Sequence, residues 1–128
     1  MSIIDYNHME GEFMELIKII KALSHQNRIR ILNLINQQDL CVCELEYIMN
    51  VKQSNASRHL TKLKEAEIIY GKRKAQWVYY QINVKLLDEH KFLKEIIENE
   101  LQNIELIKRD NEKLNKYLNS EMSCADLT

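Results

Sequence analysis

The sequence contains no proline and only two glycines, Gly11 and Gly71, among its 128 residues. Because proline breaks helices and glycine supplies left-handed turns, their scarcity allows long, uninterrupted helices. No apolar run approaches the roughly 18 residues that a membrane span requires, and the N-terminus lacks the basic and then apolar pattern of a signal peptide. These absences predict a mainly α-helical protein in the cytoplasm, without a membrane partner.

Cysteine is also scarce, with only Cys41, Cys43 and Cys124 in the chain. An odd set in a reducing compartment argues against a disulfide framework and favours metal binding or thiol reactivity. A chain of this length suffices for one domain but is short for two. We therefore expect a single domain over residues 1–128.

Neither sign of charge dominates, because the net charge is −1, yet the charges are unevenly distributed. Seven basic residues and only two acidic ones lie between Lys52 and Lys74. An acidic body with one basic segment indicates a localised site for a polyanion; a solvated charged face is the plainer alternative.

Apolar residues spaced three and four apart predict four helices in the N-terminal half of the chain. We place them at residues 9–23, from Ser24 as the N-cap through Ile35, at residues 42–49 and at residues 52–69. The next segment, IIYGKRKAQWVYYQI, is rich in β-branched and aromatic residues and predicts a β-hairpin.

The hairpin strands are expected at residues 68–70 and 76–82, with a turn at residues 71–75. The turn lacks an Asn-Gly or Asp-Gly pair, so the sequence leaves its type open.

Apolar residues recur at helical spacing from residue 84 to about residue 118, although Asn111 interrupts the seam. At 1.5 Å per residue this stretch would form a rod about 50 Å long, or two helices if it breaks. One small domain cannot cover both this stripe and the first helix, so we expect a homodimer through the N- and C-terminal helices. Residues 119–128 are expected to form a flexible tail.

The order of these elements is that of a winged helix-turn-helix. The outer face of the helix at residues 52–69 is small and polar and then basic, which suits a major groove about 12 Å wide. Lys72, Arg73 and Lys74 in the hairpin can reach phosphates or a neighbouring minor groove. The sequence thus predicts double-stranded DNA as a partner.

Three segments also resemble the arsenic-resistance repressor (ArsR/SmtB) family: KALSHQNRIRILNLI, LCVCELEYIMNVKQSNASRHLTKLKEAEII and QWVYYQI. The resemblance covers residues 12–83 and implies a homodimeric repressor that leaves its operator when a toxic metal or metalloid binds. The polar stripe and the resemblance together assign the DNA contacts to Gln53, Ser54, Asn55, Ser57, Arg58, His59, Lys62, Lys72, Arg73 and Lys74. The plainer alternative for His59 is an ordinary polar residue on the helix surface without a role in DNA binding.

Some positions depart from the family pattern. Asn50, Glu67 and Ala75 stand where glycine is common, and Lys52 stands where a serine cap is common. If positive φ is retained, each non-glycine residue costs on the order of 1 kcal/mol.

The segment LCVCEL contains two cysteines where relatives without a thiol site commonly read Leu-Ser-Val-x-Glu-Leu. Cys41 then takes the N-cap and Glu44 the N3 position of a capping box. A thiol accepts hydrogen bonds weakly, so the substitution forgoes part of a cap worth about 1 kcal/mol. Outside helical geometry the Cys41 sulfur can turn toward Cys43, and the helix dipole favours thiolate there.

These features predict a soft dithiolate site, with small core cysteines as the alternative. Two sulfurs do not complete a tetrahedral zinc site. By the family resemblance, arsenite sensors bind their ligand with three thiolates. In this sequence Glu46 occupies the position of their third cysteine. The site therefore has two sulfurs, or takes a third from Cys124 of either subunit. The expected inducer is As(III), or alternatively Sb(III) or another soft metal ion, with no organic cofactor.

Other functions compete with this one. The family's zinc site on the C-terminal helix is matched only in its first half, by Asp88 and His90. Leu101 and Ile104 replace its later histidines.

A thiol redox switch that uses the same cysteines remains an alternative to induction by a metal or metalloid. An enzyme lacks support, because the sequence has no glycine-rich phosphate loop and no base paired with a cysteine. A winged helix that binds only proteins would show a shallow salt dependence with DNA.

Overall fold

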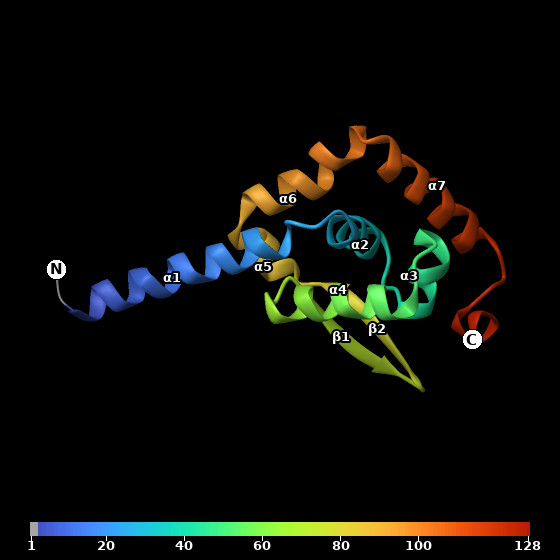
Figure 1. The fold of residues 1–128 in the computed structure, drawn as a ribbon, viewed down its shortest axis with the longest axis horizontal. Helices are drawn as coiled ribbons and strands as arrows, with labels where there is room; N and C mark the ends of the chain where they lie inside the picture. The colour runs from blue at the N-terminus through green and yellow to red at the C-terminus, as the bar shows by residue number, and fades with distance from the viewer. Residues whose placement is uncertain (1–2) are drawn as a thin grey trace.

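The computed structural model describes the backbone of residues 3–128 and the side chains from Met9 onward. The elements are α1 (Ile3–Ala22), α2 (Gln26–Gln37), α3 (Val42–Met49), α4 (Gln53–Glu65), β1 (Ile69–Lys74), β2 (Trp77–Ile82), α5 (Val84–Glu89), α6 (Lys91–Glu98), η1 (Glu100–Asn103), α7 (Glu105–Asn119) and η2 (Cys124–Leu127). The predicted class, mainly α with a two-stranded antiparallel hairpin, is confirmed (Figure 1). None of the described helices is long and apolar enough to cross a membrane.

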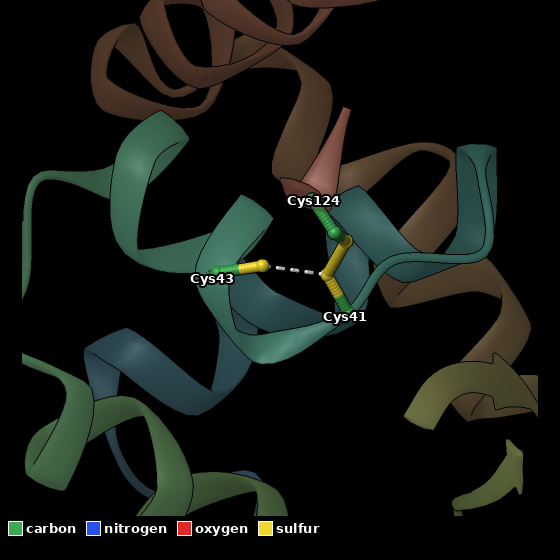
Figure 2. A group of neighbouring side chains, drawn as sticks. All are labelled: Cys41, Cys43 and Cys124. Carbon is green, nitrogen blue, oxygen red and sulfur yellow. Dashed lines mark hydrogen bonds between the residues drawn. A yellow bond between two sulfur atoms is a disulfide. The ribbon is translucent and has the colours of Figure 1, made fainter. Parts of the chain in front are cut away.

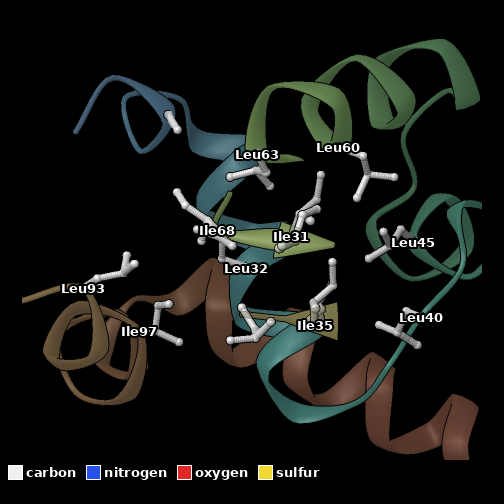
Figure 3. Close-up of a cluster of buried hydrophobic side chains, with 14 of the residues drawn as sticks. Ile31, Leu32, Ile35, Leu40, Leu45, Leu60, Leu63, Ile68, Leu93 and Ile97 are labelled. Carbon is white, nitrogen blue, oxygen red and sulfur yellow. The ribbon is translucent and has the colours of Figure 1, made fainter. Parts of the chain in front are cut away.

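Helix α2 lies at the centre of the hydrophobic core. Its Ile31, Leu32 and Ile35 are at most 2% exposed and face side chains of α4, α6 and the start of the hairpin (Figure 3). Burying one such side chain contributes about 1.5–3 kcal/mol. Because α4 packs directly on this helix, the position of the predicted DNA-reading helix is set by the core.

Helix α1 extends away from the body of the chain (Figure 1). Its large apolar side chains Met9, Phe13, Met14 and Ile20 are between 48% and 65% exposed, whereas Ile19, near its C-terminal end, is fully buried. The single chain therefore leaves most of the apolar face of α1 uncovered.

The cap of α2 differs from the prediction. His25, not Ser24, is the N-cap, and its Nδ1 accepts a hydrogen bond from the Asn27 N–H at 3.1 Å. The Ser24 hydroxyl instead donates to the Lys21 carbonyl at 2.6 Å and so closes the end of α1. Ser24 thus caps the C-terminal end of α1, and His25 caps the N-terminal end of α2.

Three non-glycine residues take the left-handed backbone at the positions where the family pattern has glycine. The φ angles are 56° at Asn50, 61° at Glu67 and 58° at Ala75. Asn50 ends α3, and Ala75 lies in the turn of the hairpin. Each position is therefore a place where glycine would remove a cost of about 1 kcal/mol.

The hairpin is longer and its turn tighter than predicted. Strands β1 and β2 pair from Ile69↔Ile82 to Lys74↔Trp77, so only Ala75 and Gln76 form the turn. The left-handed Ala75 makes a two-residue turn feasible without Asn-Gly. Gly71 serves the strand and not the turn, since a Cβ there would lie 2.9 Å from Val78 Cγ1.

The C-terminal stretch is not one helix. The backbone leaves helical geometry at His90 and again between Asn99 and Ile104, and α6 and α7 form an arch over α2 (Figure 1). The break lets polar residues of α7 reach partners on α2: Asp110 binds Arg30 through two hydrogen bonds of 2.7 and 2.9 Å. The Asn111 amide that interrupts the apolar seam accepts from Asn33 at 2.8 Å.

Residues 119–128 also differ from the expected flexible tail. They turn back to α3, and η2 begins at a capping box in which the Ser123 N–H donates to Asp126 at 2.7 Å. Cys124 is 1% exposed, and Leu127 packs against the core. The tail is thus placed by its cysteine and one leucine.

Candidate metal site and DNA-binding surface

The three cysteines form one buried cluster. Cys41 is the N-cap of α3, Cys43 lies in its first turn, and Cys124 begins η2 (Figure 2). Their sulfur atoms all lie within 4.8 Å of one another, and the side chains are at most 8% exposed. The chain therefore brings together all three predicted sulfur ligands, with Cys124 supplied by the same subunit.

In this structure Cys41 and Cys124 are joined as a disulfide, which was not expected from the sequence. Cys43 is a free thiol with its sulfur 2.9 Å from Cys41 Sγ (Figure 2). The Cα atoms of Cys41 and Cys124 are 7.3 Å apart, beyond the about 4.4–6.8 Å usual for disulfides. Once the disulfide is reduced, the three sulfur atoms lie close enough together to share one ligand.

Hydrogen bonds connect the cluster to its neighbours. The Cys41 N–H donates to Glu44 Oε1 at 3.0 Å, so the N3 carboxylate of the predicted capping box is in place. The other oxygen of Glu44 accepts from the Tyr117 hydroxyl of α7. The Tyr79 hydroxyl of β2 donates to Cys124 Sγ at 3.5 Å. The cluster is thus linked to β2 directly through Tyr79, and to α7 through Glu44 and Tyr117.

The electrostatic surroundings oppose thiolate formation. Burial raises the pKa of the Cys43 thiol, and the Glu44 carboxylate raises it further. The backbone amides at the start of α3 lower it, as the helix-dipole argument predicted, but their effect is outweighed. A ligand that needs thiolates must therefore displace protons when it binds.

Burial and Glu44 also act on the two tyrosines. Burial, followed by the hydrogen bond to Glu44, raises the pKa of Tyr117, so its hydroxyl keeps the proton it donates. Burial raises the pKa of Tyr79 in the same way, with Glu44 and Cys43 adding to it. Both hydroxyls are therefore hydrogen-bond donors at neutral pH.

The sequence identified the cysteines but missed these two contacts. Tyr79 of the hairpin packs beside Trp77 at the sulfur cluster. Tyr117 carried no signal of its own, because it falls at ordinary helical spacing and its partner Glu44 lies 73 residues away.

The predicted DNA-contacting residues follow α4 and the wing, with one exception. Gln53, Ser54, Arg58 and Lys62 are exposed on α4, while Asn55 and Ser57 are half-buried. Gln53 donates to the Ser57 hydroxyl at 2.9 Å, and Lys62 lies 3.7 Å from Glu65. Lys72, Arg73 and Lys74 are exposed along β1, not in the turn where they were expected.

The exception is His59, which is only 3% exposed and therefore unavailable to a base edge in this structure. Its ring packs against that of His25, with the centroids 4.2 Å apart. Burial, with the nearby His25, Arg28 and Arg58, lowers the pKa of His59 to about 4. The imidazole is thus neutral at physiological pH and belongs to the α2–α4 contact.

A second group of side chains of metal-ligand type lies at the surface. Glu15 of α1 lies 3.5 Å from His90 Nε2, and Glu89 is the third member. The sequence pattern paired His90 with Asp88, which is not in this group, and gave no means of placing Glu15 nearby. The arrangement matches an ordinary surface ion pair between α1 and the α5–α6 junction.

Comparison with known proteins agrees with the fold and the motifs. Residues 25–70 match the model of the family described as "Bacterial regulatory protein, arsR family". An arsenic resistance transcriptional regulator of Pseudomonas putida is 42% identical over 66 residues, which cover 51% of this chain and 52% of that protein. An arsenical resistance operon repressor of Staphylococcus aureus is 31% identical over 60% of this chain and 74% of that protein.

Among solved structures, a homodimeric winged helix-turn-helix DNA-binding domain of Mycobacterium bovis superposes with a TM-score of 0.63 at 19% identity. It covers 76% of this chain and 91% of that one, and it shows the shared fold. The chain spans about half the length of the Pseudomonas regulator. These relatives are named as regulators or repressors, in agreement with the prediction that the chain is not an enzyme. The chain belongs to the arsR family of bacterial regulatory proteins.

Proposed function

We propose that the protein is a homodimeric repressor that binds operator DNA and leaves it when As(III), or another thiophilic ion such as Sb(III), binds Cys41, Cys43 and Cys124. The observation that carries the proposal is the convergence of three buried sulfurs within 4.8 Å at the start of α3. Two relatives named for arsenic resistance support the choice of inducer.

The donor set favours a soft, three-coordinate ligand. Among the described residues, the buried group contains three sulfurs and no histidine or carboxylate. Structural zinc sites take four ligands, whereas thiolates alone select soft acceptors. In the reduced protein Cys41 and Cys124 become available, and Cys43 is already a free thiol.

The cluster is connected directly to the wing. Leu40, next to Cys41, exchanges backbone hydrogen bonds of 2.8 and 3.3 Å with Tyr80 of β2. Across the hairpin, Lys72 pairs with Tyr79, which contacts Cys124. A rearrangement of the three sulfurs would therefore move β2. Because β2 is paired with β1, this movement would shift the lysines of β1 that are proposed to contact DNA.

The cluster is connected to α4 through α3. Leu45 and Ile48 of α3 are buried in the same core as Leu60 of α4. A shift of the first turn of α3 thus changes the support of the DNA-reading helix. In a dimer the two reading helices must match half-sites about 34 Å apart, so a coupling of about 1–3 kcal/mol per site suffices to lower occupancy strongly.

The surface of the single chain supports dimer formation. Four large apolar side chains of α1 are uncovered, and Phe92 of α6 is 37% exposed. A second copy would bury such faces, and two-fold dimers are the commonest solution.

A thiol redox switch is the second candidate, because the structure contains the Cys41–Cys124 disulfide. Two thiols and one peroxide would give this disulfide and two waters. Oxidation would remove two of the three sulfur ligands, so the oxidised chain would lose its response to arsenite.

The test is operator release by arsenite from the reduced, full-length protein. The parent should release its duplex, and Cys41→Ser, Cys43→Ser and Cys124→Ser should each weaken the response. The triple variant without any thiol is the control and should not respond. Equal release of parent and triple variant by arsenite would refute the proposal, and release of the parent by peroxide alone would favour the redox candidate.

A further inference from the structure

A basic pocket of about 220 Å³ lies where the C-terminal ends of α1 and α4 meet α2. Lys18, Lys21, Arg28 and Lys62 line it, and Glu65 is its acidic residue. Lys21 and Lys62 stand in the last turns of their helices, where the helix dipole favours cations. The dipole thus explains two of the cations without any ligand.

It does not explain Arg28. This residue stands in the first turn of α2, which has no acidic residue. A cation at this end of a helix faces the positive pole, and the position favours an anion instead. Arg28 is therefore placed against the local field unless something negative joins it.

The Arg28 side chain also has a buried nitrogen without a hydrogen-bond partner in the described part of the chain. Among the described residues, the buried side-chain nitrogen and oxygen atoms without a partner are Arg28 Nε, Asn55 Oδ1 and both ring nitrogens of His59. Asn55 and His59 are one turn apart on α4, and His59 packs on His25, the N-cap of α2. Leaving a buried donor unsatisfied costs about 1–3 kcal/mol. In the pocket itself the unused atom is the donor Arg28 Nε, because Asn55 Oδ1 is an acceptor and neither Asn55 nor His59 lines the pocket.

We propose that this pocket binds a phosphate group of the DNA backbone, held by Lys18, Lys21, Arg28 and Lys62. The inference rests on the proposed function, because it takes DNA as the partner. Lys62 connects the two surfaces: it lines the pocket and continues the exposed stripe of α4 from Arg58. A phosphodiester beside the reading helix would fix its orientation without reading sequence. Free inorganic phosphate offers the same chemistry and is distinguished by the test.

The experiment measures binding of the full-length, reduced protein to a duplex that the protein itself selects from a random-sequence pool. Affinity is followed over a range of NaCl concentrations for the parent, Lys21→Gln and Arg28→Gln. Lys108→Gln is the matched control, because Lys108 is an exposed α7 lysine paired with Glu105 at 3.5 Å and far from the pocket in sequence.

Each pocket variant should weaken binding on the order of tenfold. Each should also reduce the slope of log K against log salt by about 0.9 for every phosphate that the variant no longer binds. The ratio of affinities for the selected and a scrambled duplex should stay unchanged, and the control should behave as the parent. Circular dichroism melting at the same salt confirms that each variant is folded.

Three results would overturn the inference while leaving the proposed function intact. The first is an unchanged slope in both variants, and the second is an equal loss in Lys108→Gln. The third is protection of the parent, but not of Arg28→Gln, from thermal unfolding by millimolar inorganic phosphate without any displacement of the duplex; that would assign the pocket to a free anion. A parent that selects no duplex at all would overturn the proposed function, and the inference with it.

Discussion

Tyr117→Phe removes one hydroxyl between α7 and the sulfur cluster and keeps the ring. Tyr117 is 4% exposed and Glu44 is 7% exposed, so water does not readily replace the lost donor. A hydrogen bond to a charged group contributes about 1.5–3 kcal/mol, and the carboxylate would keep only the Cys41 N–H as a partner. We therefore expect a loss of about 2 kcal/mol in the free energy of unfolding.

The measurement is urea unfolding of the reduced protein, with Tyr47→Phe as the control. Tyr47 is 42% exposed and its ring lies 5.8 Å from that of Tyr117, so its own hydroxyl should matter by less than about 0.5 kcal/mol. In Glu44→Gln the loss caused by Tyr117→Phe should shrink, because the charge is gone. Equal losses in Tyr117→Phe and Tyr47→Phe would refute the view that Glu44 holds α7 to the site.

Three further predictions concern other parts of the fold. The pKa of His59 falls from 6.5 to about 4 on folding. As the pH is lowered, His59 is therefore protonated in the unfolded chain before it is protonated in the folded chain. Stability should therefore be complete above pH 6.5 and fall by about 3 kcal/mol toward pH 4, and His59→Gln should lack this decrease in pH-dependent urea unfolding. Arg30→Met leaves Asp110 buried and unpaired and should cost about 3–5 kcal/mol, measured by thermal melting, with recovery in Arg30→Met/Asp110→Leu. Ala75→Gly should raise the unfolding free energy by up to about 1 kcal/mol, since φ is 58° there.

Each of these has an outcome that contradicts it. Parallel pH curves for the parent and His59→Gln would show that another group carries the acid sensitivity. A double variant at Arg30 and Asp110 as unstable as Arg30→Met would mean that packing, not charge pairing, holds α7. A less stable Ala75→Gly would show that the entropy of the unfolded chain outweighs the relief of the left-handed backbone.

Local patterns were sufficient for several elements. The bounds of α3 were predicted at residues 42–49, and Asn50 ends it in the left-handed conformation. Apolar residues spaced three and four apart predicted α4, and Ala56, Leu60 and Leu63, which recur at that spacing, are buried. These features depend on contacts within one or two turns, which the sequence displays directly.

Other features depend on partners far along the chain. Periodicity allowed one long helix from residue 84, whereas the break after Asn99 is favoured by the pairing of Asp110 with Arg30, 80 residues away. His59 looked like a surface residue of α4, and only the packing of His25 against it shows that it is buried. In both cases the deciding energy comes from burial and charge pairing between segments.

By itself the sequence determined the kind of elements, their order and the presence of a thiol pair at a helix start. Cys41 and Cys43 could be recognised because a weak cap had replaced a strong one, which is a local property. That Cys124 joins them was decided by the tertiary structure, since the α6–α7 arch returns the chain to α3. The same arch brings Tyr117 to Glu44, because burial of α7 on α2 fixes distances that no local spacing encodes.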